Sequence, residues 1–164
     1  MSEAHEKKHT ALSEMDPLMR EKLREGGAVS FSPKGTSMLP MLRSSGDSVT
    51  LVEPPARLRK GTVALFVSTN ADGERKYVLH RLVDIRKGRL VFMGDNRKRT
   101  DETVSRDSVI GVVSGFTRKG KEYSGREARI RLYSRYMVLT RSVRPPALKL
   151  LRSVIGMRKL FKKQ

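Results

Sequence analysis

The stretch TVALFVS, residues 62–68, decides the fold that we expect for this chain. It is apolar on both faces of an extended backbone, with Val63, Leu65 and Val67 on one face and Ala64 and Phe66 on the other. A strand of this composition avoids water on both sides. We therefore expect it to be buried on both sides within a sheet.

Further stretches of strand character flank this segment. Val29 and Phe31 alternate with polar neighbours, and Lys87-Gly88 is suited to a two-residue hairpin turn. The other strands are expected at residues 48–52, 77–86, 89–93 and 109–116. The pattern predicts a mainly β fold, in which a meander of short strands curls into a barrel-like sheet.

One short helix is expected before the strands. Asp16-Pro17 is suited to the N-cap and first turn of a helix, and Gly26-Gly27 is suited to its end. The apolar stripe of this helix would consist of Leu18, Met19 and Leu23.

The chain after the strands is basic and has helical periodicity. Within residues 129–143, apolar residues recur at helical spacing as Leu132, Tyr136, Leu139 and Val143. After Pro145-Pro146, residues 147–163 combine one apolar face with many lysines and arginines and no acidic residue. Residues 145–164 are thus expected to contact an anionic membrane surface, to dock on a partner protein or to pack on the chain's own domain.

Composition limits the classes of function. The chain has 164 residues, a formal charge of +18 and no cysteine, which excludes disulfides and thiolate chemistry. The charge favours an anionic partner. Because the sequence contains neither a long apolar run nor an apolar leader, we expect a cytoplasmic protein. We divide it into a flexible leader (1–15), a β domain (16–118) and a basic, partly helical C-terminal region (119–164).

The stretch KGTSMLPML, residues 34–42, is the first candidate for chemistry. Ser37 lies between a turn led by Gly35 and a proline three residues later, among apolar residues that include Met38. Such a serine is a candidate nucleophile, although it could also be a turn former that binds its own backbone.

A serine hydroxyl needs a base, and an imidazole base needs a carboxylate to orient it. His80 lies in an apolar strand and is either this base or a core histidine with a satisfied hydrogen bond. Asp95 and Asp101 are the candidate carboxylates, and for Asp95 we favour a role in bracing its loop.

These residues together resemble the type I signal peptidases and the wider S24/S26 serine peptidases. The resemblance covers about residues 22–118, and five boxes carry it in order: Gly35-Thr36-Ser37-Met38-Leu39-Pro40, Gly46-Asp47, His80-Arg81, Gly94-Asp95-Asn96 with Asp101, and Val109-Ile110-Gly111-Val112. Bacterial members use a lysine base, whereas His80 is similar to the histidine of the branch in archaea, spore-forming bacteria and the endoplasmic reticulum.

The resemblance implies a signal peptidase-like β-barrel and a serine endopeptidase without metal or cofactor. Ser37 would be the nucleophile, His80 the general base and Asp101 the orienting acid, with Asp95, Gly35 and Met38 supporting the site. Some members place a hydroxyl at the position of Gly35 to bind the oxyanion, and this chain lacks it. Signal peptidases have a membrane-spanning segment, and we expect none in this chain because no apolar run is long enough.

Other functions are compatible with the same sequence. The charge would suit a non-catalytic basic module that binds nucleic acid or a membrane surface, but the sequence has few aromatics and no RNA-stacking signature. A self-cleaving repressor peptidase would use lysine as its base and cleave an Ala-Gly or Cys-Gly bond upstream, and no such pair precedes Ser37. A member that has lost activity and kept the fold for docking is a third alternative.

Overall fold

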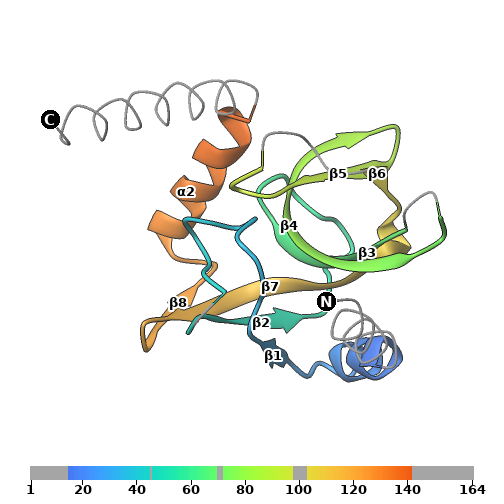
Figure 1. The fold of residues 1–164 in the computed structure, drawn as a ribbon, viewed down its shortest axis with the longest axis horizontal. Helices are drawn as coiled ribbons and strands as arrows, with labels where there is room; N and C mark the ends of the chain where they lie inside the picture. The colour runs from blue at the N-terminus through green and yellow to red at the C-terminus, as the bar shows by residue number, and fades with distance from the viewer. Residues whose placement is uncertain (1–14, 45, 70–71, 98–102, 142–164) are drawn as a thin grey trace, which may run out of the picture.

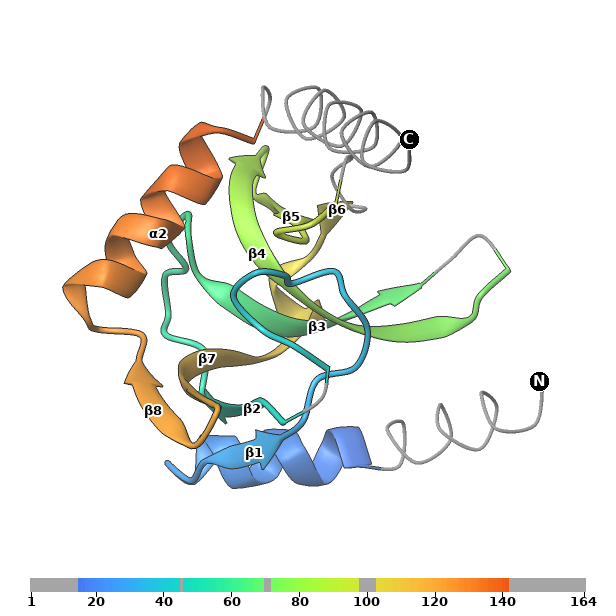
Figure 2. The same ribbon diagram turned by 60° about the vertical axis from the view of Figure 1, so that its left-hand side comes forward.

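The structure, a computed structural model, describes residues 15–44, 46–69, 72–97 and 103–141. Within these ranges it consists of one antiparallel sheet of eight strands and two helices (Figures 1 and 2). The strands are β1 (Val29–Phe31), β2 (Ser48–Val52), β3 (Val63–Thr69), β4 (Arg75–Arg86), β5 (Arg89–Met93), β6 (Thr103–Val104), β7 (Val109–Arg118) and β8 (Lys121–Ser124). The mainly β prediction is confirmed.

The expected strands are present, with boundaries that differ by at most two residues. Lys87 and Gly88 both have positive φ angles, 48° and 77°, as a tight hairpin turn between β4 and β5 requires. The sequence pattern missed β6, which has only two residues, and β8, which is short and mostly exposed.

The predicted meander is wrong in its strand order, and the described sheet is open. The order of strands is β1-β2-β7-β3-β4-β5-β6, with β8 paired to β7 off this path, so β7 returns from the end of the domain to pair with both β2 and β3. The sheet is open because β1 and β6 end this path and do not pair with each other. Long-range pairing of this kind leaves no local signal in the sequence.

Strand β3 is buried on both faces, as predicted. Ala64 and Phe66 belong to one apolar cluster, with Leu82 and Phe92 among its members, whereas Leu65 and Val67 belong to another on the opposite face. β3 thus separates two small cores.

The N-terminal helix, described for residues 15–24, packs Met19 and Leu23 against the second of these clusters. Leu18, in contrast, is 66% exposed and does not belong to the buried stripe. Asp16 lies inside the helix instead of capping it, because Met15 is already helical. Its carboxylate accepts hydrogen bonds from Arg20, Arg75 and Tyr77.

Helix α2 (Ala128–Leu139) covers one end of the sheet (Figure 2). Ile130 and Tyr133 pack against an apolar cluster, and Met137 is buried. Just beyond the helix, Arg141 donates hydrogen bonds to the Val83 carbonyl and the Asp84 carboxylate. The C-terminal end of α2 is therefore attached to β4 by hydrogen bonds, in addition to the apolar contacts that the helix makes along its length.

Several predicted features lie outside the described residues: most of the leader, Asp101, and the helix expected at 147–163. Within the described ranges, neither helix is long and apolar enough to cross a membrane.

The Asp84 carboxylate should make stability depend on acid pH. Hydrogen bonds from Lys60, then Arg141 and Arg86, hold the pKa of Asp84 well below its usual range. Because the pKa is lower in the folded state, the stabilisation is complete above the unfolded pKa near 4 and is lost as pH falls below it. We expect Asp84→Asn to lower the urea midpoint at neutral pH and the difference from wild type to narrow between about pH 5 and pH 2.

The control is Glu122→Gln on β8, an exposed glutamate with no ion pair among the described residues. Its midpoint should follow that of wild type across the same range. A difference between wild type and Asp84→Asn that stays constant with pH would contradict the assignment.

Candidate functional site

The loop that carries Ser37 is held by its apolar residues. Gly35 has a φ of 85°, in the left-handed region that favours glycine, and it turns the chain into the segment. Met38, Met41 and Leu42 are buried in one cluster with Val49, Val63 and Phe116. Ser37 itself is half-buried. The apolar side chains thus fix an irregular backbone on which the serine is displayed.

Polar contacts close the same loop. The Arg43 N–H donates to the buried Asp47 carboxylate at 2.8 Å, and Arg118 donates to the Pro40 carbonyl at 2.7 Å. Asp47 belongs to the Gly46-Asp47 box, where it holds the far end of the loop. These hydrogen bonds attach the loop to the rest of the domain and restrain the backbone around Ser37.

The turn after β5 binds the Ser37 loop directly. The Asn96 backbone N–H donates to the Ser37 carbonyl at 2.7 Å, and the Asn96 side-chain amide donates to the Thr36 carbonyl at 3.2 Å. Residues about 60 positions apart in the chain are therefore joined by two hydrogen bonds.

His80 lies beside the same turn. It is on β4 opposite Ala64, is 3% exposed, and has its ring 6.4 Å from that of Phe66. A Cβ atom placed on Gly94 would lie 2.9 Å from His80 Nε2 and 2.8 Å from the Ser37 carbonyl oxygen. The imidazole and the Ser37 backbone thus both approach the space that a side chain at position 94 would fill, which is why glycine is needed there.

The structure brings the backbone carbonyl of Ser37 close to the His80 imidazole at Gly94, and the two predicted reacting groups are not directly bonded. The structure has no hydrogen bond between the Ser37 hydroxyl and the His80 imidazole, both of which are described. Hydrogen bonds of this type are often long in free enzymes and shorten when substrate binds. Asp101, the predicted orienting acid, lies outside the described residues.

Asp95 binds Arg81, the residue next to His80. Arg81 donates from Nε and Nη2 to the two carboxylate oxygens at 2.8 and 2.7 Å, and both side chains are 1% exposed. Arg81 also donates to the Gly61 carbonyl and contacts Met41 Sδ in the Ser37 loop. A bidentate, dry ion pair of this kind fixes the backbone at both of its ends.

Helix α2 completes this ion pair from outside the segment that resembles the peptidases. Tyr133 donates its hydroxyl to Asp95 Oδ2 at 3.0 Å, and Arg81 donates to Ser134 Oγ at 2.7 Å. The Arg81 guanidinium also lies 5.3 Å from the centre of the Tyr133 ring. Sequence analysis missed both residues, because the pairing of a C-terminal helix with the site has no local signature.

No metal centre is evident in the described ranges, where no group of three or more histidine, aspartate or glutamate side chains is placed to hold an ion. The described residues at the site offer the His80 imidazole, the Ser37 hydroxyl and a carboxylate already bound to arginine, with the hydroxyls of Tyr133 and Ser134 hydrogen-bonded to the ion pair. Such a set suits proton transfer and acyl transfer better than metal binding.

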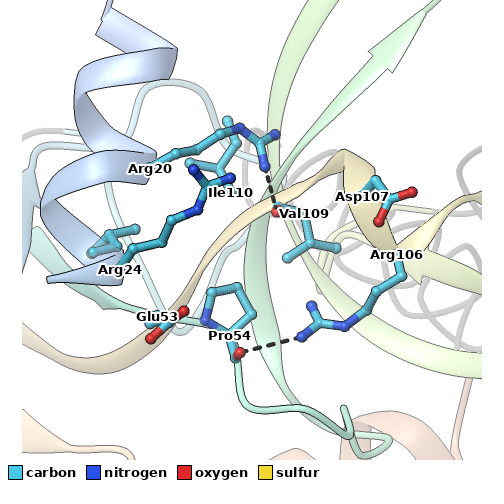
Figure 3. A pocket seen from close by; sticks show the side chains of 9 residues that line it. Arg20, Arg24, Glu53, Pro54, Arg106, Asp107, Val109 and Ile110 are labelled. Carbon is cyan, nitrogen blue, oxygen red and sulfur yellow. Dashed lines mark hydrogen bonds between the residues drawn. The ribbon is translucent and has the colours of Figure 1, made fainter. Parts of the chain in front are cut away.

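A pocket of about 220 Å³ lies elsewhere, between the N-terminal helix, the end of β2 and the start of β7 (Figure 3). None of the predicted site residues lines it. Arg20 and Arg106 point toward it, but their guanidinium groups donate to the carbonyls of Val109 and of Pro54 and Pro55. We do not place the predicted catalytic site in this pocket, because its lining residues include no nucleophile beside a base.

Comparison with known proteins yields no family: no protein-family model, curated protein sequence or solved structure matches the chain. The function is therefore inferred from the residues and their geometry.

Removal of one partner of the buried ion pair should cost more stability than removal of both. Asp95→Ala would leave the Arg81 charge buried without its partner, so we expect a loss of about 3–5 kcal/mol in the free energy of unfolding. Urea denaturation of purified protein measures it. Arg81→Met combined with Asp95→Leu removes both charges and should recover a large part of the loss. An Asp95→Ala variant whose free energy of unfolding lies within 1 kcal/mol of the wild-type value would contradict this account.

Gly94→Ala tests the contact between the His80 and Ser37 segments. The new methyl group would overlap His80 Nε2, the Ser37 carbonyl and the Arg97 side chain, so these groups or the backbone at position 94 have to move. We expect the imidazole NMR resonances of His80 to shift strongly, together with the Asn96 amide resonance. The control Asn96→Asp keeps the backbone donor, and it should perturb the imidazole far less. Unchanged His80 resonances in Gly94→Ala would rule out the close approach.

Proposed function

We propose that the chain is a serine endopeptidase of the signal peptidase-like S24/S26 type, with Ser37 as nucleophile and His80 as general base. The proposal includes the β-barrel fold of that family. The mainly β architecture is compatible with such a fold. The observation that carries it is the meeting of the Ser37 loop and the His80 imidazole at Gly94. The order of the boxes in the sequence supports the same assignment.

The reaction would proceed by acyl transfer. His80 accepts the hydroxyl proton while Ser37 Oγ attacks a peptide carbonyl carbon, and the carbonyl oxygen becomes an oxyanion near the Ser37 backbone N–H. The C–N bond then breaks, and the leaving amine takes the proton from His80. Water, deprotonated by His80, hydrolyses the Ser37 ester and restores the free hydroxyl. No cofactor or metal takes part in this scheme.

The surrounding residues would hold this geometry. Asp101 is proposed to orient the imidazole. Asp95 acts through Arg81, since both of its oxygens accept hydrogen bonds from that guanidinium. Gly35 and Met38 position the backbone on either side of the nucleophile. The second oxyanion donor is not supplied by a side chain at position 35, which is glycine.

The substrate would be a peptide or protein, for instance the leader of a small peptide or a precursor held at a membrane. The resemblance favours small residues before the scissile bond. We also propose a cytoplasmic location, peripheral to the inner face of the membrane, since a charge of +18 favours anionic surfaces.

Labelling with a serine-reactive acylating probe tests the proposal. The labelling rate of wild type should lie far above that of an unactivated serine, because the imidazole base takes the hydroxyl proton as the probe is attacked. Ser37→Ala should abolish labelling. His80→Ala should slow it by about a hundredfold to ten-thousandfold.

Matched controls separate the site from general reactivity. Ser30→Ala replaces an exposed serine on β1, and His5→Ala replaces a histidine of the leader, so both should label at the wild-type rate. Thermal unfolding of each variant shows that the fold is retained. Labelling of folded wild type that survives Ser37→Ala, or that is absent throughout, would overturn the proposed function.

A further inference from the structure

Helix α2 has a second apolar stripe that the domain does not cover. Ile130, Tyr133 and Met137 face the sheet, whereas Leu132, Tyr136 and Leu139 are 69%, 56% and 80% exposed. These three residues follow one another at intervals of four and three, so they share one side of the helix. We call Leu132, Tyr136 and Leu139 the outer stripe.

The outer stripe groups three exposed apolar side chains on one side of a single helix. Scattered exposed apolar side chains are ordinary, but a continuous row of two leucines and a tyrosine marks an interaction site more often than chance exposure. Figure 1 shows α2 at the periphery of the described fold, with the sheet on one side of it only. As far as the described residues are concerned, the outer stripe is therefore accessible to a large partner.

The charges around the stripe indicate what that partner is. At 100° per residue, Arg131 and Arg135 flank the stripe on one side and Arg129 on the other. All three are exposed. Arg129 pairs with Glu127 and lies over the Tyr123 ring, whereas no ion pair of Arg131 or Arg135 occurs among the described residues. No aspartate or glutamate follows Glu127 in the sequence. An apolar row bordered by arginines complements an anionic lipid surface, whose headgroups attract the arginines while its acyl chains accept the leucines.

We propose that α2 docks through its outer stripe onto a membrane surface rich in anionic phospholipid, with the helix parallel to the surface. The inference concerns residues 128–139, apart from the tail at 145–164, and it does not depend on peptidase activity. Nucleic acid would use the arginines but would leave the leucines in water. A second copy of the chain would bring the arginines of two helices together and repel.

Tryptophan fluorescence tests the docking at this helix specifically, because the chain has no tryptophan of its own. In full-length Tyr136→Trp, vesicles of mixed phosphatidylglycerol and phosphatidylcholine should shift the emission to the blue, and brominated acyl chains should quench it. The matched control is Leu18→Trp, which replaces a 66% exposed leucine on the N-terminal helix, away from α2 in both views (Figures 1 and 2). Its emission should not respond.

Co-sedimentation with the same vesicles measures how much each group of residues contributes to the partition coefficient. Leu132→Ser combined with Leu139→Ser should lower the partition coefficient about tenfold, since two partly buried leucines are lost. Arg129, Arg131 and Arg135 changed together to Gln should lower it about a hundredfold at low salt. Leu18→Ser combined with Ile85→Ser removes two exposed apolar side chains elsewhere and should leave it unchanged.

Four results would overturn the proposal. These are vesicle binding without any response of the tryptophan at position 136, equal responses to neutral and anionic vesicles, a response to duplex DNA or RNA but not to lipid, and a dimer in solution that the Leu132/Leu139 variant dissociates. The first would assign membrane binding to another part of the chain, and the last would assign the stripe to self-association.

Discussion

The buried ion pair between Arg81 and Asp95 is the interaction on which the rest of the site depends. Taking both charges out of water is costly, and only their bidentate geometry and additional hydrogen bonds offset that cost. The extra partners come from the Gly61 loop, from Met41 and from helix α2. The pair therefore joins β4, the turn after β5, the Ser37 loop and α2 in one rigid contact.

This arrangement explains how small local features determine the position of the proposed reacting groups. His80 precedes Arg81 on β4, and Gly94 precedes Asp95 in the turn, so fixing the ion pair also fixes the approach of His80 to Gly94. Asn96, on the other side of Asp95, binds the Ser37 carbonyl. Gly94, Asp95 and Asn96 thus contact His80, Arg81 and the Ser37 loop, respectively. These contacts explain why the three residues occur together in one box.

Much of the fold followed from the sequence, because strands leave local signals. The doubly apolar stretch at 62–68 predicted β3, and Lys87-Gly88 predicted the hairpin. The insertion of β7 between β2 and β3, and the contacts of Tyr133 and Ser134 with the ion pair, depend on residues far apart in the chain and could not be read locally. Arg81 did leave a signal, since an arginine within the apolar run around His80 requires a buried partner. The roles of Ser37 and His80 remain predictions that rest on this geometry and on the resemblance.

The most direct test of the central claim is a crystal structure of the protein after reaction with an acylating probe. The account predicts an ester on Ser37 Oγ, with His80 Nε2 within hydrogen-bond distance of that oxygen and the Arg81–Asp95 pair intact beneath it. An adduct on another residue would contradict it. So would an acylated Ser37 whose oxygen faces away from His80.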